Sequence, residues 1–349
     1  MKTALKYIVS AAVAAVLLYF SFRGVRWDDF AAGLGNCRWE WIAAAMAAGG
    51  MSFWVRALRW RKLILPIDRT ISRKVSFNAI NISYLANLVL PRIGEFVRCG
   101  FIVRHSEEDG NGHRRASYDK VLGTVVLERS LDVVTMLLLV AFMTVAMWGR
   151  YGQFFMDRIF GPFSERLGAG LWTVPAAAAA VLSASLWAVW HYRNRNRMLK
   201  AVSGFAKGLY EGLVSCMKMD RSWVFAAHTA VIWGLYWFMS YAVLNSVSGM
   251  DTSALTPELA SAVAGLSSAG PTDALFLMLA GSLSSLVPVP GGFGAFHYIV
   301  ATALSAVYGL PFELGIVFAT LSHESQTVMQ IICGCCSYVS ESWTIVKKK

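Results

Sequence analysis

The sequence predicts an all-α polytopic membrane protein, and three observations carry this prediction. The chain has 349 residues, of which 56% are hydrophobic and only 15% are charged, and its mean hydropathy is +0.50. Several apolar runs approach the roughly 20 residues that a helix needs to cross a bilayer. The basic residues cluster between these runs, so cytoplasmic loops and anionic lipid headgroups explain the net charge of +11 better than nucleic acid does.

The apolar runs and their interruptions give the expected elements in chain order. Uninterrupted spans are expected at about residues 4–22, 41–58, 120–148, 171–191, 222–248 and 312–338. Two further segments, 75–103 and 274–309, are apolar but are broken by Pro, Gly or charged residues. Residues 192–221 are basic with apolar residues at helical spacing, which indicates either a surface amphipathic helix or a helix packed on the bundle.

Positive charge sets the expected orientation of these elements. The two termini and residues 56–74 and 192–221 are basic and should be cytoplasmic, whereas the acidic loop 249–273 should lie outside. This orientation requires each broken segment to enter and leave on one side, as a re-entrant helical hairpin. The chain then forms two inverted repeats, 4–148 and 171–338, each with three transmembrane helices and one hairpin, which is an arrangement typical of transporters.

The first broken segment, with the sequence YLANLVLPRIGEFVRCGFIVR, holds polar residues at membrane depth. A charge at the bilayer centre costs about 2.5–3.5 kcal/mol, so the segment must face protein or a wet cavity. Arg92, Glu95 and Arg98 lie three residues apart, so they share one face if helical, and Glu95 can pair with either arginine. With Asn87 beside the proline break, the net positive charge favours an anionic group.

The second broken segment has a tip, VPVPGGFGAFH, that is rich in Pro and Gly. Its prolines prevent a regular helix, and its glycines permit positive φ and close backbone approach. A helix that starts near Phe293 would direct its free N–H groups at an anion, whereas the alternative is a tight turn between two short spans. The candidate residues here are Pro290, Gly291, Gly292, Gly294 and His297, the histidine being either a packing residue or a proton carrier.

Ionisable residues also lie inside the apolar spans. At 1.5 Å per residue, Glu128 and Glu324 lie roughly 15–18 Å deep, at corresponding places in the two halves. Glu128 and Asp132 share a helix face, whereas Arg129 points about 100° away and is expected to pair elsewhere. These residues are candidates for transport or for a structural charge network. His323 and Glu324 do not form an HExxH motif, and no zinc-type cysteine spacing occurs, so no metal site is expected.

Four stretches occur together in a characteristic order: VRALRW, NLVLPRIGEFVR, LERSLDVV and LVPVPGGFGAFH. As a set they resemble the lysylphosphatidylglycerol synthase transmembrane-region family, over essentially the whole chain, 1–349, as a single integral-membrane domain. Its best-known members are the flippase portions of the multiple peptide resistance factors, which move aminoacylated phosphatidylglycerol between leaflets. The resemblance assigns to the family motifs Arg92, Gly94, Glu95, Arg98, Glu128, Arg129, Asp132, Pro290, Gly291, Gly292 and Gly294.

The resemblance implies a flippase-like transporter of the bacterial inner membrane, with both termini cytoplasmic. We expect it to move a charged-headgroup phospholipid or a polyprenyl-linked lipid through a polar intramembrane cavity. The alternatives are a membrane-embedded enzyme or synthase subunit that acts on a polyprenyl-phosphate-linked sugar lipid, and a scaffold for envelope biogenesis.

The sequence gives little support to the enzyme alternative. It contains no ATP-binding or DxD motif and no soluble aminoacyl-transferase domain, so neither enzymatic activity nor a cofactor is expected. The expected partner is membrane lipid and not nucleic acid, and the sequence leaves open a homo-oligomer and a separate lipid-modifying enzyme.

Overall fold

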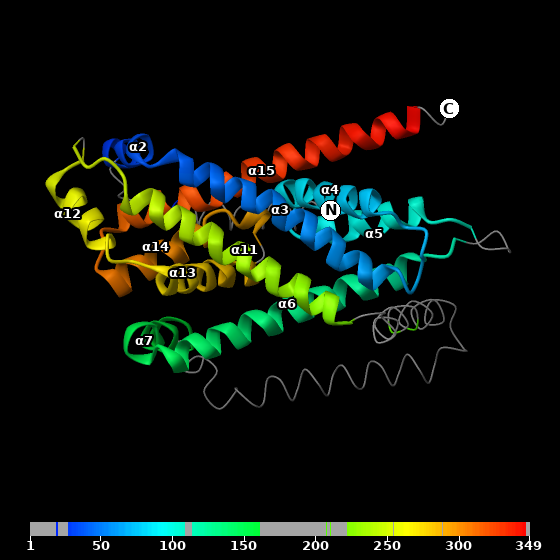
Figure 1. Ribbon diagram of the computed structural model, residues 1–349, viewed down its shortest axis with the longest axis horizontal. Coiled ribbons are helices and arrows are strands. Elements are labelled where there is room, and N and C mark those ends of the chain that lie inside the picture. The colour runs from blue at the N-terminus through cyan, green and yellow to red at the C-terminus, as the bar shows by residue number, and fades with distance from the viewer. Residues whose placement is uncertain are drawn as a thin grey trace. The chain divides into compact units, whose positions relative to one another are not determined.

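The structure is a computed structural model that describes residues 19, 27–108, 114–160, 207, 210, 222–253, 255–287 and 289–346. The regular elements of this part of the chain are all helices, as the sequence predicts (Figure 1). The expected spans 4–22 and 171–191 and the basic segment 192–221 lie outside the described residues, isolated positions apart, and stay predictions.

The chain divides into two compact units. The first comprises the residues up to 62, residues 70–105 and those from 220 onward, and it holds both broken segments. The second comprises residues 63–69 and 106–219. The inverted arrangement of two repeats stays a prediction.

Two long apolar helices of the first unit coincide with expected spans. α3 (Trp39–Ile64) covers the expected span 41–58, and α11 (Ser222–Ser248) matches the span 222–248. Among the described residues, these two are long and apolar enough to cross a membrane, and the number rises to 4 if each of two bent helix pairs is one span. α3 continues past its apolar run, because the positive charges of Arg61 and Lys62 suit the last turn of a helix.

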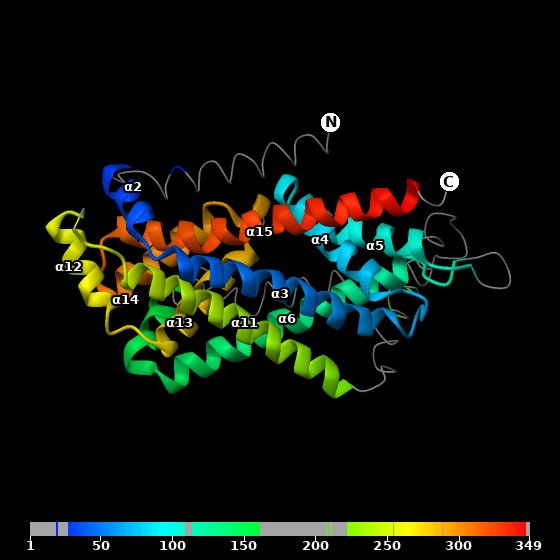
Figure 2. The same cartoon turned by 45° about the horizontal axis from the view of Figure 1, so that its top comes forward.

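The first broken segment folds as a helical hairpin. α4 (Arg73–Val89) and α5 (Ile93–His105) pack against each other and lie side by side in both views (Figures 1 and 2). α4 ends at Leu90, whose extended backbone (φ −137°, ψ 126°) is the conformation that a following proline favours. The predicted break at Pro91 is therefore confirmed.

The second broken segment also forms a hairpin. α13 (Pro271–Leu283) and α14 (Ala295–Tyr308) pack against each other, and the short 3₁₀ turns η4 (Ser284–Leu286) and η5 (Pro290–Gly292) lie between them. Gly294 precedes α14 with a positive φ of 79°. The helix therefore starts slightly later than the sequence predicts, because the glycine-rich turn extends to this residue.

Three more helices belong to the first unit. α2 (Trp27–Asn36) and α12 (Pro257–Leu266) are not expected from the sequence. α12 lies in the acidic loop, and Pro257 at its first position is a helix-start signal that the short apolar pattern obscures. α15 (Phe312–Val346) contacts α14, α4 and α2 (Figure 2). α15 is not among the helices apolar enough to cross a membrane, so the expected crossing at 312–338 stays a prediction.

The second unit is built around α6 (Tyr118–Ala146), which covers most of the expected span 120–148. After α6 the chain bends by 110°. The bend leads into the short helices η1 (Trp148–Gly152), α7 (Gln153–Phe155) and η2 (Met156–Phe160). Tyr151 and Phe155, which follow the bend, are fully buried.

Candidate functional site at the two hairpin tips

The tips of the two hairpins meet within the first unit. The Nη2 atom of Arg92 donates to the carbonyl oxygen of Ser285, with 3.3 Å between the two atoms. A Cβ atom added at Gly291 would lie 3.4 Å from Cδ2 of Leu88, near the end of α4. The structure therefore joins the two predicted tips through an Arg92–Ser285 contact and a Leu88–Gly291 contact.

Arg92 has an unusual backbone. Its φ is +61°, and it is the only non-glycine residue with positive φ among the described residues. Left-handed backbone costs a side-chain-bearing residue roughly 1–2 kcal/mol. The side chain is exposed, so burial of the arginine does not explain this conformation. The hairpin turn therefore exposes the guanidinium of Arg92 in spite of the free-energy cost of its left-handed backbone.

Asn87 holds the other side of the first tip. Its Oδ1 accepts a hydrogen bond of 2.7 Å from the backbone N–H of Gly94. This satisfies one of the N–H groups that the first turn of α5 leaves without a helical partner. A Cβ atom at Gly94 would lie far inside contact distance of the Ser83 carbonyl. Asn87 and Gly94 therefore close the hairpin, and glycine is required there for close approach.

Glu95 and Arg98 form an ion pair on α5. The distance between Glu95 Oε2 and Arg98 Nη2 is 3.0 Å, and the Arg98 side chain is fully buried. The guanidinium of Arg98 also lies over the Trp60 ring, 4.6 Å from its centroid. The shared face of Arg92, Glu95 and Arg98 that the sequence suggests is not formed, because Arg92 precedes the helix. Of the two arginines, Arg98 is the one that Glu95 contacts.

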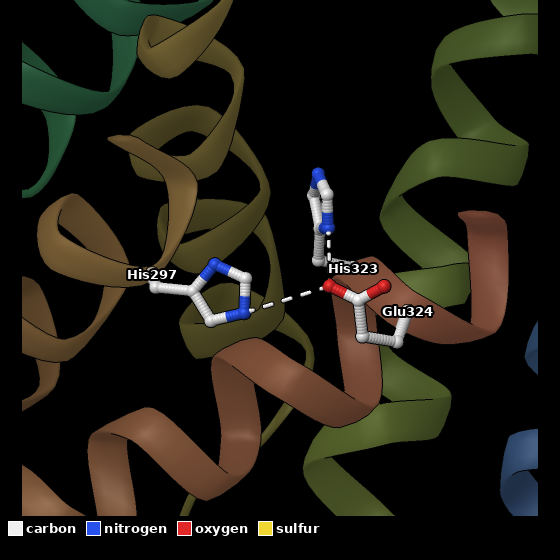
Figure 3. A group of neighbouring side chains, drawn as sticks. All are labelled: His297, His323 and Glu324. Atoms are coloured by element: carbon white, nitrogen blue, oxygen red, sulfur yellow. Dashed lines mark hydrogen bonds and ion pairs between the residues drawn. The ribbon is translucent and has the colours of Figure 1, made fainter. Parts of the chain in front are cut away.

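The second tip is backed by two histidines and a glutamate (Figure 3). The Nε2 atom of His323 lies 2.8 Å from the carbonyl oxygen of Gly291. The Nδ1 atom of His323 lies 2.9 Å from Glu324 Oε1, and Nε2 of His297 lies 3.7 Å from the same oxygen. His297 comes from α14 and is buried, whereas His323 and Glu324 come from α15. The fold thus joins two predicted residues, His297 and Glu324.

His323 is the member of this group that sequence reasoning did not select. An HExxH motif places both histidines on one helix, so this motif does not identify His323. Here the second histidine is His297, on the neighbouring helix α14. Each of the three residues offers a possible metal-ligand atom, and these atoms lie within 4.8 Å of one another. A short-range motif cannot reveal a group that two packed helices assemble.

Glu128, Arg129 and Asp132 lie on α6, in the second unit. Glu128 is fully buried, and the Arg129 guanidinium lies 3.9 Å from Glu128 Oε2 and 4.0 Å from Asp132 Oδ2. The expectation that Arg129 pairs away from these acids is therefore incomplete. The long arginine side chain reaches both carboxylates in spite of its offset around the helix.

The fold and the hairpin tips define a helical membrane protein in which two broken segments meet at their tips, one with an exposed arginine and the other rich in glycine. A family model, the lysylphosphatidylglycerol synthase TM region, matches residues 7–334, so the chain belongs to this family. The resemblance noted in the sequence is thereby confirmed, and it places the chain among membrane proteins related to lipid handling. Searches of curated proteins and of solved structures found no match.

Proposed function

We propose that this protein moves a lipid with a charged headgroup between the two leaflets of a membrane. The observation that carries the proposal is the hydrogen bond from the exposed Arg92, at the first tip, to the Ser285 carbonyl oxygen, at the second tip. A lipid headgroup that crosses a bilayer must exchange its hydration for polar protein groups, since an unpaired charge is costly there. The two tips together offer such groups to an anionic phosphate.

The chemistry of Arg92 suits a phosphate oxygen. A guanidinium carries five N–H donors in a planar fork, so it can hold the Ser285 carbonyl and a phosphate at the same time. Gly291 and Gly292 have positive φ values of 58° and 80°, which glycine adopts without a steric penalty, and neither residue adds a side chain to the turn. A headgroup can therefore approach the backbone of this turn closely while the arginine neutralises its charge.

The proposal includes a specific arrangement in the membrane. Both hairpins are re-entrant and belong to inverted halves of one domain in the bacterial inner membrane, with cytoplasmic termini. Single cysteines at positions 65 and 110 of a cysteine-free variant should then react only from the cytoplasm, and one at 255 only from outside. Reaction of 65 and 110 from opposite sides would exclude the first re-entrant hairpin.

The transport proposal is tested with purified protein in vesicles that contain fluorescent phospholipid or a labelled polyprenyl phosphate. The parent should accelerate exchange between leaflets, and the recovered lipid should be chemically unchanged, which separates transport from an enzymatic role. Arg92→Gln should slow exchange by about 10-fold or more, since a hydrogen bond to a charged group contributes about 1.5–3 kcal/mol. Arg92→Lys should recover part of the rate, because it keeps the charge but not the fork.

Arg38 supplies the matched control. It is an exposed arginine whose Nε lies 2.7 Å from Glu40 Oε1, and it belongs to neither hairpin. Arg38→Gln should leave the exchange rate unchanged at equal protein incorporation. A parent protein no faster than protein-free vesicles for every lipid, or a full rate in Arg92→Gln, would refute the proposal. Membrane lipid is the partner it requires, and a second copy of the chain or a separate lipid-modifying enzyme is not needed.

A further inference from the structure

The hydrogen-bond pattern around His297, His323 and Glu324, the three side chains drawn in Figure 3, requires a hydrogen or a metal ion between His323 and Glu324. The carbonyl oxygen of Gly291 can only accept, so Nε2 of His323, at 2.8 Å, must carry the hydrogen. In a neutral imidazole, Nδ1 then presents a lone pair. That lone pair faces the Glu324 carboxylate at 2.9 Å. Two acceptors at this distance need a proton or a metal ion between them.

A second histidine in the same unit, His105, also lies between a carbonyl oxygen and a carboxylate. It serves as the comparison for bridging by a proton without a metal ion. His105 Nδ1 lies 2.8 Å from the Phe101 carbonyl oxygen, and its Nε2 lies 2.6 Å from Glu341 Oε1. A hydrogen on each ring nitrogen would satisfy both acceptors there. No third ligand-type residue completes a metal group at His105 among the described residues. The His105 pair is therefore the reference for the simpler explanation.

The His323 group differs by its third member. Nε2 of His297 lies 3.7 Å from the same Glu324 oxygen that approaches His323. Metal–ligand distances of about 2.0–2.2 Å in a tetrahedral site place neighbouring ligand atoms roughly 3.3–3.6 Å apart. The two ligand separations at Glu324 Oε1, 2.9 and 3.7 Å, lie on either side of that value. All three ligand atoms lie within 4.8 Å of one another, so side-chain movement would bring them to one ion.

The surroundings also match those of a metal site. Histidines that bind metal usually donate their other ring N–H to a carbonyl or a carboxylate, which fixes the tautomer. The His323–Gly291 hydrogen bond has this geometry. The rings of Phe293 and Phe296 lie 5.0 and 5.3 Å from the His323 ring, so one side of the group is apolar. Glu324 is 37% exposed, which leaves the other side open.

We propose that His297, His323 and Glu324 bind one divalent transition-metal ion, with zinc as the best match, and leave a fourth coordination position open. Two imidazoles and one carboxylate are a ligand set that zinc favours. Magnesium and calcium prefer oxygen ligands and suit the group poorly. The ion fastens α14 to α15 behind the glycine-rich tip. This site was not expected from the sequence, and it does not depend on the transport proposal.

Cobalt binding tests the proposal, because Co²⁺ occupies zinc sites and absorbs visible light. The full chain is purified without an affinity tag, stripped with a chelator and titrated with Co²⁺. The parent should bind one equivalent and show visible bands typical of tetrahedral nitrogen and oxygen ligation, and Zn²⁺ should displace it. His297→Gln, His323→Gln and Glu324→Gln should each weaken binding by about 100-fold or more, since loss of a supporting residue alone costs 10–100-fold.

His105→Gln is the matched control, and it should leave the cobalt spectrum and affinity unchanged. Thermal unfolding of each variant without metal shows whether it folds. If the three ligand variants do not fold, the spectrum of the parent decides, because ligation by Cys335 and Cys336 would add intense near-ultraviolet charge-transfer bands. A parent that binds no Co²⁺, a sulfur-type spectrum, or equal binding in all three variants would overturn the site. A proton would then be the bridge between His323 and Glu324.

Discussion

The tip between α4 and α5 and the tip between α13 and α14 both reverse the chain, and they use opposite residues to do so. The first passes through Pro91 and Arg92, and its one left-handed residue carries a long charged side chain. The second contains Gly291, Gly292 and Gly294, all with positive φ, and no charged side chain. Both tips reverse the chain through residues with positive φ. The first tip bears a steric cost because that residue is Arg92, whereas the second avoids this cost because its residues are glycines.

The difference separates the roles of the two tips. A strained residue persists only where the surrounding structure determines it, and such residues cluster at functional sites. Arg92 therefore places a positive charge at a position where glycine would form the same turn without the steric cost. The glycine-rich tip provides backbone, and its ionisable groups come from His297 and from His323 and Glu324 behind it. We infer that the first tip supplies charge and the second supplies shape.

The largest effect is expected at the base of the first tip. Gly94→Val should destabilise the protein by about 4 kcal/mol or more, because a Cβ at this position collides with the backbone of Ser83 and the turn cannot yield. Thermal unfolding in detergent measures the loss. Gly100→Val is the control on the same helix, where no atom lies within 4 Å of an added Cβ. Equal stability of the two variants would show that the hairpin does not depend on close approach.

The next effect concerns the ion pair that supports the first tip. Glu95→Ala should cost about 3 kcal/mol, because it removes an ion-pair partner of the fully buried Arg98. Glu95→Gln should fold, since it keeps the shape and a hydrogen-bond acceptor. The control is Glu40→Ala, which removes the exposed partner of Arg38 and should cost no more than about 1 kcal/mol. A Glu95→Ala protein as stable as the parent would contradict this role for the pair.

The contrast between the tips also marks how far the sequence could predict the fold. Pro91 predicted the break between α4 and α5, and the glycines after Pro290 predicted an irregular turn, because both depend on local backbone chemistry. The spans at α3 and α11 followed from uninterrupted apolar composition. α12 was missed because its short apolar pattern is weaker than the turn residues around it. Local sequence patterns therefore predicted most helices and turns, but not which of these elements pack against each other.

The candidate site could be predicted only in part for the same reason. Arg92 and Gly291 were each identified as site residues, but the contact between their two tips depends on packing between residues far apart in sequence. Helical spacing placed Arg98 beside Arg92, whereas the structure buries Arg98 against Trp60. His323 becomes a candidate site residue only because the packing of α15 brings it next to the Gly291 carbonyl oxygen. Such contacts require the folded chain.

A moderate effect on stability and a large effect on transport are expected at the second tip. Gly292→Val places a side chain at φ +80°, which should cost roughly 1–2 kcal/mol. An added Cβ would lie 3.4 Å from His323 Nε2, which is tight but not a collision, so the protein should fold. Lipid exchange should fall by about 10-fold or more, because the side chain blocks headgroup approach to the turn. The same vesicle assay and thermal unfolding measure the two quantities.

Gly309 gives this prediction a matched control. It has φ +66° at the end of α14, no atom lies within 4 Å of an added Cβ, and it is outside the tip. Gly309→Val should lose similar stability but keep the exchange rate. If both variants lose exchange equally, general destabilisation explains the result and the shape role of the second tip is wrong.

Arg92→Gly is expected to give the smallest change in stability. Compared with Arg92→Gln, it separates the effect of backbone strain at position 92 from the effect of the positive charge. Glycine removes a left-handed cost of about 1–2 kcal/mol but adds about 0.5–1 kcal/mol of chain entropy, so the net gain should be about 0.5–1 kcal/mol. Arg92→Gln keeps the strain at φ +61° and should gain nothing. Both variants remove the cation, so both should lose lipid exchange, measured beside their unfolding temperatures. A more stable Arg92→Gly protein with full exchange would mean that the first tip needs a turn and not a charge.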